Sequence, residues 1–274
     1  MRGADACAIA RSPLHLLGLA LCLALTATAL LGYSLMRPDR RTSEPARAAT
    51  PVPDLTRPLR LPTRRAVRPR PDSRFLVARV QPGETVVLRA RPFGRVLRRL
   101  GALTEFGSPR ALSVVRTVRG RWLAVTTPEL ANGRLGWIDA RARAVRFART
   151  PIALEIDLSR RELVVREGDR VARRMRVGIG RPESPTPVGR FAITDKLPGA
   201  EYSAVYGCCI LALSGRQPNL PAGWQGGDRL AIHGTPNPAG IGGKVSAGCL
   251  HAATGDLVSL MRTAPVGTPV VVRA

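Results

Sequence analysis

Residues 233–251 read HGTPNPAGIGGKVSAGCLH and bring His233, Cys249 and His251 together in one short segment. The remaining histidine of the chain, His15, lies far away in an apolar stretch. The chain has only three histidines and five cysteines, and this segment holds two of the histidines and one cysteine. Such a grouping indicates a thiol nucleophile with its base, a metal site, or coincidence. The paired spacings that zinc ligands usually show are absent, so the pattern favours the nucleophile.

The segment supplies more than a cysteine. A free thiol titrates at about 8.5, so it needs a neighbouring imidazole to form the attacking thiolate at neutral pH. The apolar run LAIH ends at His233, and VSAGCL places Cys249 in a loop bounded by glycine. Gly248 has no side chain, so we expect backbone N–H groups beside the cysteine to approach a substrate oxygen closely. Ser246 is placed to orient either the imidazole or a backbone carbonyl.

His251 follows Cys249 by two positions. Residues two apart on an extended backbone face the same side, so we expect His251 to reach the same cleft as Cys249. There it would contact the substrate or support the structure, becoming charged only at lower pH, or it would share the role of base. The alternative is an ordinary surface or packing residue.

The sequence around this segment predicts a mainly β domain over residues 150–274. IALEIDLSRRELVVREGDRVARRMRVGIG alternates as three strands, with turns near Ser159 and at Gly168. TPVGRFAITD, CILALSG and RLAIHG add further short strands, and GTPVVVRA closes the chain as another. Only TGDLVSLMR has helical spacing, with Thr254 as its expected cap and Pro265 as its stop.

The full string HGTPNPAGIGGKVSAGCLH closely resembles the signature of the L,D-transpeptidases of the YkuD family, in which His-Gly-Thr precedes Ser-x-Gly-Cys. GRPESPTPVGRFAI matches the upstream Thr-Pro-x-Gly segment of that family, and IDLSRRELVV fits its first hairpin. The resemblance covers roughly residues 150–273. It implies a β-sandwich catalytic domain with one short helix.

The resemblance also implies a reaction. The family comprises exported cysteine enzymes that remodel peptidoglycan, without a metal or an organic cofactor. The cysteine attacks the bond between the third residue of a stem peptide and the following D-alanine. A thioester forms, D-alanine leaves, and an amine on a neighbouring stem accepts the acyl group. Carried over by position, Cys249 is the nucleophile, His233 the general base and Ser246 an assisting residue. The backbone of Gly248 and Cys249 supplies the oxyanion hole.

One position departs from the family pattern, because the residue two after the cysteine is normally Arg and here is His251. The family resemblance therefore does not predict the substrate choice or the pH optimum of this chain. The other substrate contacts that the resemblance implies are Gly234 and Tyr206. Two alternatives remain open. The same thioester could end in hydrolysis, as in an L,D-carboxypeptidase, or the chain could be a non-catalytic, basic wall-binding protein.

Residues 76–149 predict a smaller β domain. GRWLAVTTPELANGRLGWIDA has the pattern of a hairpin that turns at Asn132-Gly133, with Trp122 and Trp137 on its two strands. The short strands and the GW pair resemble the bacterial src-homology-type barrels that accompany wall enzymes. This segment holds fifteen arginines and four acidic residues. Its charge indicates either an ordinary polar surface or a ligand-binding role.

The N-terminal part predicts export. Residues 13–36 contain no charged side chain and are long enough for a transmembrane signal-anchor, with residues 1–12 as a cytoplasmic tail. A signal peptide cleaved near the small residues TATA is the alternative. Residues 37–75 are rich in Pro and Arg, as expected of a disordered tether that is either a spacer or a contact to anionic lipid or wall polymer. These features predict a single-pass membrane protein with its catalytic domain on the cell-wall side. A net charge of +24 does not indicate a nucleic-acid partner, because an exported domain would not meet one.

Three cysteines, Cys208, Cys209 and Cys249, fall in the predicted exported part. Their odd number leaves at least one thiol unpaired within the chain. Cys208 and Cys209 are adjacent, and adjacent cysteines rarely bridge to each other because the geometry strains the backbone. The apolar run CILALS therefore favours two buried thiols. Pairing of one of them with another chain, or near the active site, remains the alternative.

Overall fold

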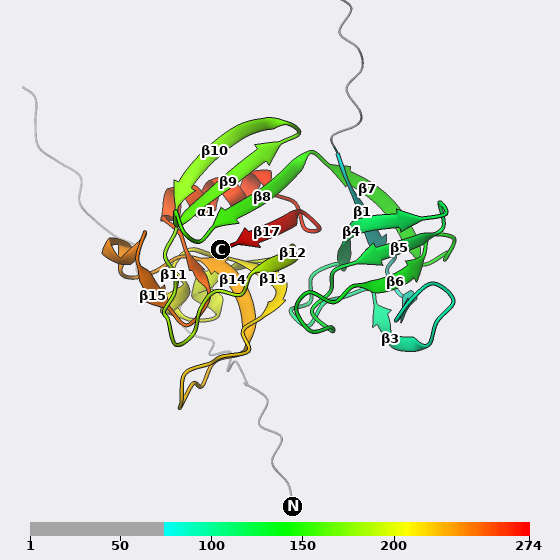
Figure 1. Ribbon diagram of the computed structural model, residues 1–274, viewed down its shortest axis with the longest axis horizontal. Helices are drawn as coiled ribbons and strands as arrows, with labels where there is room; N and C mark the ends of the chain where they lie inside the picture. The colour runs from blue at the N-terminus through cyan, green and yellow to red at the C-terminus, as the bar shows by residue number, and fades with distance from the viewer. Residues whose placement is uncertain (1–73) are drawn as a thin grey trace, which may run out of the picture. The chain divides into compact units, whose positions relative to one another are not determined.

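The computed structural model describes residues 74–274, which form two large β-sheets, a small two-stranded sheet and one α-helix (Figure 1). The mainly β fold with a single short helix, predicted from the sequence, is confirmed for this part of the chain. The predicted tail at 1–12, the predicted span at 13–36 and nearly all of the predicted tether at 37–75 lie outside the described residues.

The localisation predicted from the sequence is wrong for the part of the chain that the structure describes. It required a helix that spans the membrane, but no helix between residues 74 and 274 is both long enough and apolar enough to do so.

The first sheet has seven strands in the order β3-β2-β6-β5-β4-β1-β7. Its core contains Leu88, Leu112 and Ile138, each at most 2% exposed. The predicted hairpin is confirmed, since β5 and β6 pair antiparallel on either side of a turn in which Gly133 has a φ of 78°. The strands are β1 (Phe75–Val80), β2 (Thr85–Arg89), β3 (Val96–Gly101), β4 (Ala111–Val118), β5 (Trp122–Val125), β6 (Gly136–Asp139) and β7 (Val145–Thr150).

The strand pairing does not support the closed barrel expected over residues 76–149. The two end strands, β3 and β7, do not pair with each other, so the order of strands is open. Hairpin and turn signals identify neighbouring strands correctly, but closure depends on a pairing between strands that are distant in sequence, which such local signals do not report.

The second sheet has eight strands in the order β10-β9-β8-β17-β12-β13-β14-β16, and β11 pairs with β15 in a small separate sheet. One hydrophobic core, built from fully buried side chains such as Leu154, Leu211 and Ile232, runs along the large sheet. The strands are β8 (Ile152–Asp157), β9 (Glu162–Glu167), β10 (Arg170–Arg176), β11 (Ile179–Gly180), β12 (Gly189–Pro198), β13 (Cys209–Arg216), β14 (Arg229–His233), β15 (Lys244–Ser246), β16 (Leu250–His251) and β17 (Pro269–Arg273).

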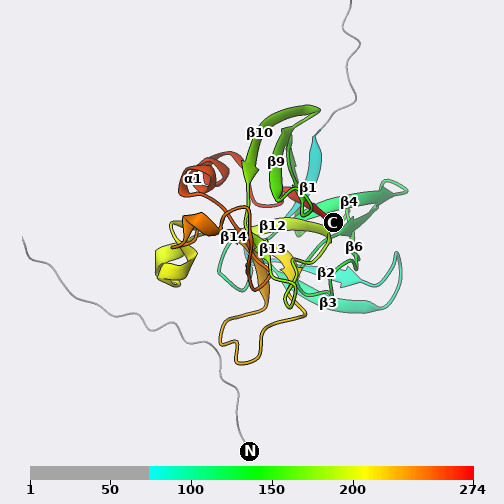
Figure 2. The ribbon, with the colours of Figure 1, turned by 60° about the vertical axis from the view of Figure 1, so that its left-hand side comes forward.

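The helix α1 (Thr254–Thr263) lies beside the sheet and buries Leu257 and Leu260 in the same core (Figure 2). It ends before Pro265, as predicted. The expected cap at Thr254 is wrong by one position, because Thr254 is the first helical residue and the N-cap is Ala253, which has no capping side chain. Short 3-10 turns occupy Gly199–Glu201, Ala204–Tyr206 and Pro238–Gly240.

The pairing of β14 with β16 brings the two ends of the 233–251 segment together. The two strands are parallel, with Ile232 opposite Leu250 and His233 opposite His251. Parallel neighbours need a crossover, and here residues 234–249 make it, pairing β15 with β11 on the way. Cys249 therefore lies at the start of β16, beside the strand that ends in His233.

Candidate functional site

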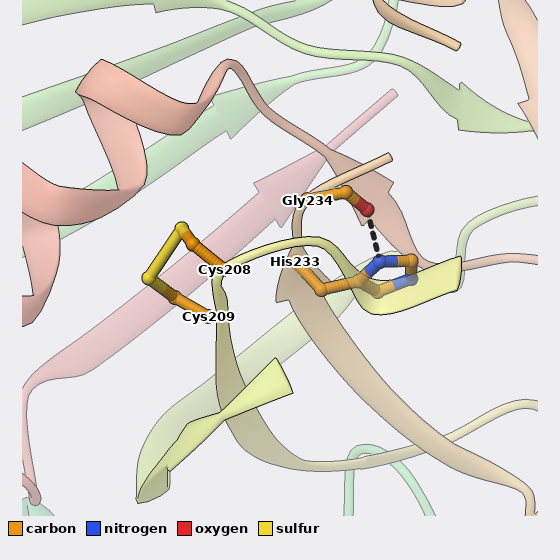
Figure 3. The surroundings of a disulfide bond; sticks show 4 residues. All are labelled: Cys208, Cys209, His233 and Gly234. Carbon is orange, nitrogen blue, oxygen red and sulfur yellow. Dashed lines mark hydrogen bonds between the residues drawn. A yellow bond between two sulfur atoms is a disulfide. The ribbon is translucent and has the colours of Figure 1, made fainter. Parts of the chain in front are cut away.

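Cys249, His233 and His251 line one cavity of about 420 Å³ at the β14–β16 edge of the large sheet. The sequence motif predicted that these three residues lie together, and the parallel pairing of β14 with β16 explains why. His233 lies opposite His251, and Cys249, two positions before His251, shares its face because side chains alternate along an extended chain. The rings of His233 and His251 lie against each other at an interplanar angle of 56°, with 4.8 Å between their centroids. Figure 3 shows His233 beside the turn that carries Cys208 and Cys209.

His233 is held in one orientation by the residue that follows it. Its Nδ1 lies 2.6 Å from the carbonyl oxygen of Gly234, a distance at which Nδ1–H donates to the carbonyl (Figure 3). This assignment leaves Nε2 as the nitrogen that accepts a proton. Burial, and to a smaller extent the nearby His251, lower the pKa of His233 to about 4, although the hydrogen bond to the Gly234 carbonyl acts in the opposite direction. His233 is therefore neutral at physiological pH.

Gly234 is required by close packing. A Cβ at this position would lie 2.8 Å from the Tyr206 carbonyl oxygen and 2.9 Å from the Cα of Gly207. The Gly234 N–H donates to the Tyr206 carbonyl at 2.8 Å and is also 3.3 Å from the carbonyl oxygen of Cys209. The sequence predicted Gly234 as a substrate contact. The structure shows Gly234 as the peptide unit that links His233 to the turn before β13, and its contact with a substrate stays a prediction.

The Cys249 thiol is free, which satisfies the odd count of cysteines. It lies against the backbone of β14, where the sulfur is 3.8 Å from the carbonyl oxygen of Arg229. Burial raises the pKa of Cys249 to about 11, and a hydrogen bond from the Ala231 backbone opposes the rise. Among the described residues, no hydrogen bond joins this thiol to His233. At rest, therefore, the site holds a neutral thiol and a neutral imidazole rather than an ion pair.

Ser246 organises the cysteine loop rather than the imidazole. Its hydroxyl donates to the Cys249 carbonyl at 2.6 Å and accepts the Gly248 N–H at 3.1 Å. Of the two roles that the sequence left open for Ser246, the structure therefore gives the orientation of a backbone carbonyl. The Gly248 N–H, predicted as part of an oxyanion hole, is already engaged. The Cys249 N–H has no hydrogen-bond partner among the described residues.

Two buried polar side chains that the sequence did not single out hold the same loop. Thr186, from the Thr-Pro-x-Gly segment, donates to the Gly248 carbonyl at 2.8 Å and accepts from the Gly180 N–H at 2.9 Å. The Gln217 amide group lies 2.9 Å from the Pro185 carbonyl and 3.2 Å from that of Ala247. The Thr-Pro-x-Gly motif was a signal for Thr186, and nothing in the local sequence marks Gln217.

Substitution of Gly248 by alanine is expected to destabilise the fold by about 3 kcal/mol. Gly248 has a φ of 117°, and a Cβ there would lie 1.9 Å from Nε2 of Gln217. Chemical denaturation of the purified variant measures the loss. Gly255→Ala is the matched control, because a Cβ at Gly255 meets nothing within 4 Å and an alanine suits the helix. Equal stability of the two variants would contradict this account of the loop.

The other two predicted contacts also face the cavity. Tyr206 packs edge-on against His233, with 4.9 Å between ring centroids. His251 is half-buried, and burial lowers its pKa. The backbone of His251 pairs with Gly178, whose N–H and carbonyl it engages at 2.8 and 2.9 Å. His251 is thus fixed by its backbone, while its ring contacts the ring of His233.

Cys208 and Cys209 form a disulfide with each other, so the expectation of two buried thiols is wrong (Figure 3). The pair sits where the turn at Gly207, with a φ of 61°, enters β13 at Cys209. Cys208 precedes the strand, so the ladder between β12 and β13 does not fix its backbone in an extended form. Its carbonyl accepts from the Gly199 N–H at 2.9 Å.

Other groupings in the described residues are few. No cluster of three His, Cys, Asp or Glu side chains between residues 74 and 274 is placed to hold a metal ion. The charged side chains at the cavity are Arg181 and Arg229, and no Asp or Glu lines it. The cavity therefore combines a cationic edge with apolar walls such as Leu197 and Ile210.

Comparison with known proteins agrees with the motif. Residues 151–272 match the family model of the L,D-transpeptidase catalytic domain, YkuD. The chain is 30% identical over 120 residues to the candidate L,D-transpeptidase YkuD of Bacillus licheniformis, covering 44% of this chain and 64% of that protein. It is 31% identical over 105 residues to the candidate L,D-transpeptidase YqjB of Bacillus subtilis, covering 35% and 56%. The chain thus spans less than two thirds of the length of these curated relatives.

Two solved structures align with this chain at low TM-scores. An L,D-transpeptidase from Mycobacterium smegmatis aligns with a TM-score of 0.38 and 18% identity, over 73% of this chain and 99% of that one. L,D-transpeptidase 3 from Mycobacterium tuberculosis aligns with a TM-score of 0.37 and 18% identity, over 51% and 74%. The family model, the curated relatives and the motif that holds Cys249 and His233 agree, and this chain carries at residues 151–272 an L,D-transpeptidase catalytic domain of the YkuD family.

Proposed function

We propose that this protein is a peptidoglycan L,D-transpeptidase that uses Cys249 as nucleophile and His233 as general base. The observation that carries the proposal is the shared cavity of Cys249 and His233, with Nδ1 of His233 bonded to Gly234 so that Nε2 accepts a proton. The catalytic domain would extend over residues 150–274 and the smaller β domain over 76–149.

The first half-reaction forms a thioester. The Cys249 thiol gives its proton to Nε2 of His233, and the sulfur bonds to the carbonyl carbon of the third stem residue. Catalytic hydrogen bonds are often long in a free enzyme and shorten with substrate, so the resting thiol need only turn away from β14. The carbon–nitrogen bond to D-alanine then breaks. The electron pair stays on that nitrogen, and His233 returns the proton to it.

The second half-reaction transfers the acyl group. An amine of a neighbouring stem attacks the thioester carbon and gives a proton to His233. The carbon–sulfur bond breaks, and the sulfur recovers its proton. If water takes the place of the amine, the same steps give an L,D-carboxypeptidase, so only the acceptor distinguishes the two activities.

The Cys249 N–H is the available oxyanion donor in this site, because the Gly248 N–H is bonded to Ser246. Ser246 and Thr186 fix the Cys249 and Gly248 carbonyls, and this fixes the peptide planes on either side of the donor. A donor held in place before the reaction stabilises a developing negative charge without reorganisation. Without an arginine at position 251, the lining cation that remains to meet a carboxylate of a stem peptide is Arg181, because Arg229 is already paired with Glu105.

The wild-type protein tests this function directly. Incubation with a disaccharide-tetrapeptide is expected to release one D-alanine for each acyl group transferred, and to add the mass of the acyl group to the protein transiently. A cross-linked dimer in the presence of an amine acceptor identifies the transpeptidase, and free disaccharide-tripeptide identifies the carboxypeptidase. Folded, reduced Cys249 that yields neither D-alanine nor an adduct would overturn the proposal.

A further inference from the structure

The loop between β3 and β4, residues 102–110, reaches the cavity that holds Cys249. Its Phe106 lines the cavity and packs in one apolar cluster with Tyr202, Ile210 and Cys249. The loop belongs to the seven-stranded sheet, whereas the cysteine and histidine belong to the eight-stranded one. The described residues all belong to one compact unit, so this wall is part of the same body as the catalytic residues.

The loop is internally fixed. The Thr104 N–H donates to the Ser108 carbonyl at 2.9 Å, and the Gly107 N–H returns to the Thr104 carbonyl at 3.1 Å. The Thr104 hydroxyl also accepts the Phe106 and Ser108 N–H groups. Buried Arg110 donates to the Leu103 carbonyl at 2.8 Å. A turn closed in this way presents Phe106 with little conformational freedom left to lose on binding.

Both residues before Phe106 anchor the loop to the other sheet. The Thr104 hydroxyl donates to the carboxylate of Asp195, which is 0% exposed. Glu105 forms an ion pair with Arg229, whose side chain is 9% exposed. The Arg229 guanidinium also lies 5.5 Å from the ring centroid of Phe106, at the distance of a cation–π contact. Buried and charged partners of this kind define one position for the loop.

Arg229 also connects the loop to the thiol. Its guanidinium donates to the Thr194 hydroxyl at 2.8 Å and to the Leu213 carbonyl at 2.6 Å, which fixes the side chain on the catalytic side. Its carbonyl oxygen lies 3.8 Å from the sulfur of Cys249. One residue therefore contacts Phe106 through its side chain and Cys249 through its backbone.

A second group of hydrogen bonds, at Asn132, links the two sheets. Asn132 and Arg216 exchange two hydrogen bonds, with the Asn132 amide donating to the Arg216 carbonyl at 2.6 Å and accepting the Arg216 N–H at 2.9 Å. The Arg216 side chain donates to the Pro128 carbonyl at 2.9 Å. The two sheets are therefore linked at two separate places, the 102–110 loop and Asn132.

We propose that the 102–110 loop is a wall of the catalytic cavity and that Phe106 is a specificity-determining residue that contacts the substrate peptide beside Cys249. The proposal rests on the proposed function for the identity of the peptide, a carboxylate-bearing stem. The seven-stranded domain then sets substrate affinity, while the eight-stranded domain performs the chemistry. Phe106 takes no part in the proton transfer from Cys249 to His233, so its removal should change the affinity for the substrate rather than the rate of the chemical step.

The first test is steady-state kinetics with the disaccharide-tetrapeptide. Phe106→Ala is expected to raise KM about tenfold while kcat changes less than threefold, because an aromatic contact contributes to binding rather than to bond breaking. Phe106→Leu is expected to recover part of the loss. Phe147→Ala is the matched control, since Phe147 is 49% exposed in the same domain and does not line the catalytic cavity. An unchanged KM for folded Phe106→Ala would overturn the proposal.

The second test is independent of turnover. Alkylation of Cys249 is followed by mass spectrometry with iodoacetamide, a small reagent, and with a bulky aromatic maleimide. Phe106→Ala is expected to accelerate the bulky reagent at least about fivefold more than the small one, whereas Phe147→Ala changes neither ratio. If the wild-type protein releases no D-alanine, the proposed transpeptidase function is refuted. The ratio of the two alkylation rates would still show whether Phe106 forms part of the cavity wall. Equal acceleration of both reagents would refute the wall.

Discussion

Cys249→Ala is expected to abolish D-alanine release, with a loss of at least about 10⁴-fold, and to eliminate the transient acyl adduct. The reason is that the thioester requires a sulfur at this position, and the described chain offers no substitute. The remaining two cysteines of residues 74–274, Cys208 and Cys209, are bonded to each other. The rate acceleration that the oxyanion donor and the cavity provide without a nucleophile is small compared with that of the complete site.

The measurement is intact mass together with enzymatic detection of D-alanine, on the wild type and the variant side by side. Thermal unfolding shows whether the variant keeps its fold, which it should, because Cys249 lies in a loop and the residue as a whole is not fully buried. Cys249→Ser provides a second comparison, since it keeps a nucleophilic atom of higher pKa at the same place. A Cys249→Ala protein that still releases D-alanine at a rate within tenfold of the wild type would exclude the thioester route.

The pairing of Cys249 with His233 could be predicted from the sequence because both residues belong to one short motif, residues 233–251. Their spatial relation follows from one parallel register, in which His233 lies opposite His251. The same motif also predicted a role for Gly248, as a position where backbone N–H groups approach a substrate oxygen, and the structure adds a second reason for a glycine there. The structure shows that Gln217, far away in the sequence, occupies the space that a side chain at Gly248 would need.

The features that the sequence did not predict depend on contacts between distant segments. Thr186 and Gln217 hold the cysteine loop from 62 and 30 residues away along the chain. Phe106 reaches the cavity from the other sheet. Neither alternation nor turn chemistry carries this information, because both describe only neighbours along the chain. The disulfide between Cys208 and Cys209 was missed for a different reason, since a general expectation about adjacent cysteines outweighed the local turn at Gly207.

His233→Gln is expected to lower kcat/KM at pH 7 by about 10³-fold to 10⁴-fold. Because burial raises the pKa of Cys249 to about 11, the thiol is almost entirely protonated at pH 7 and depends on a base. Glutamine keeps a similar volume and can donate to the Gly234 carbonyl, but it cannot accept the thiol proton. His251→Gln is the matched control, and we expect it to cost less than about tenfold.

The pH dependence distinguishes a base from a merely structural histidine. With the pKa of His233 lowered to about 4, the imidazole is already neutral above that pH, so the acid limb of wild-type kcat/KM should have its midpoint near pH 4 rather than near 6.5. Between this limb and the thiol pKa of about 11, the wild-type rate should be nearly level. The His251 charge lowers the pKa of His233, so His251→Gln should move the acid limb to slightly higher pH.

His233→Gln should behave differently over the same range. Without a base, the rate follows the fraction of thiolate, which rises about tenfold for each pH unit below the thiol pKa. The variant should therefore approach the wild type as the pH rises toward 10, and the two profiles should converge at the alkaline end. Stopped assays of D-alanine release from pH 4 to 10 measure both curves. A His233→Gln profile that stays level and parallel to the wild type would show that His233 supports the fold without taking the proton.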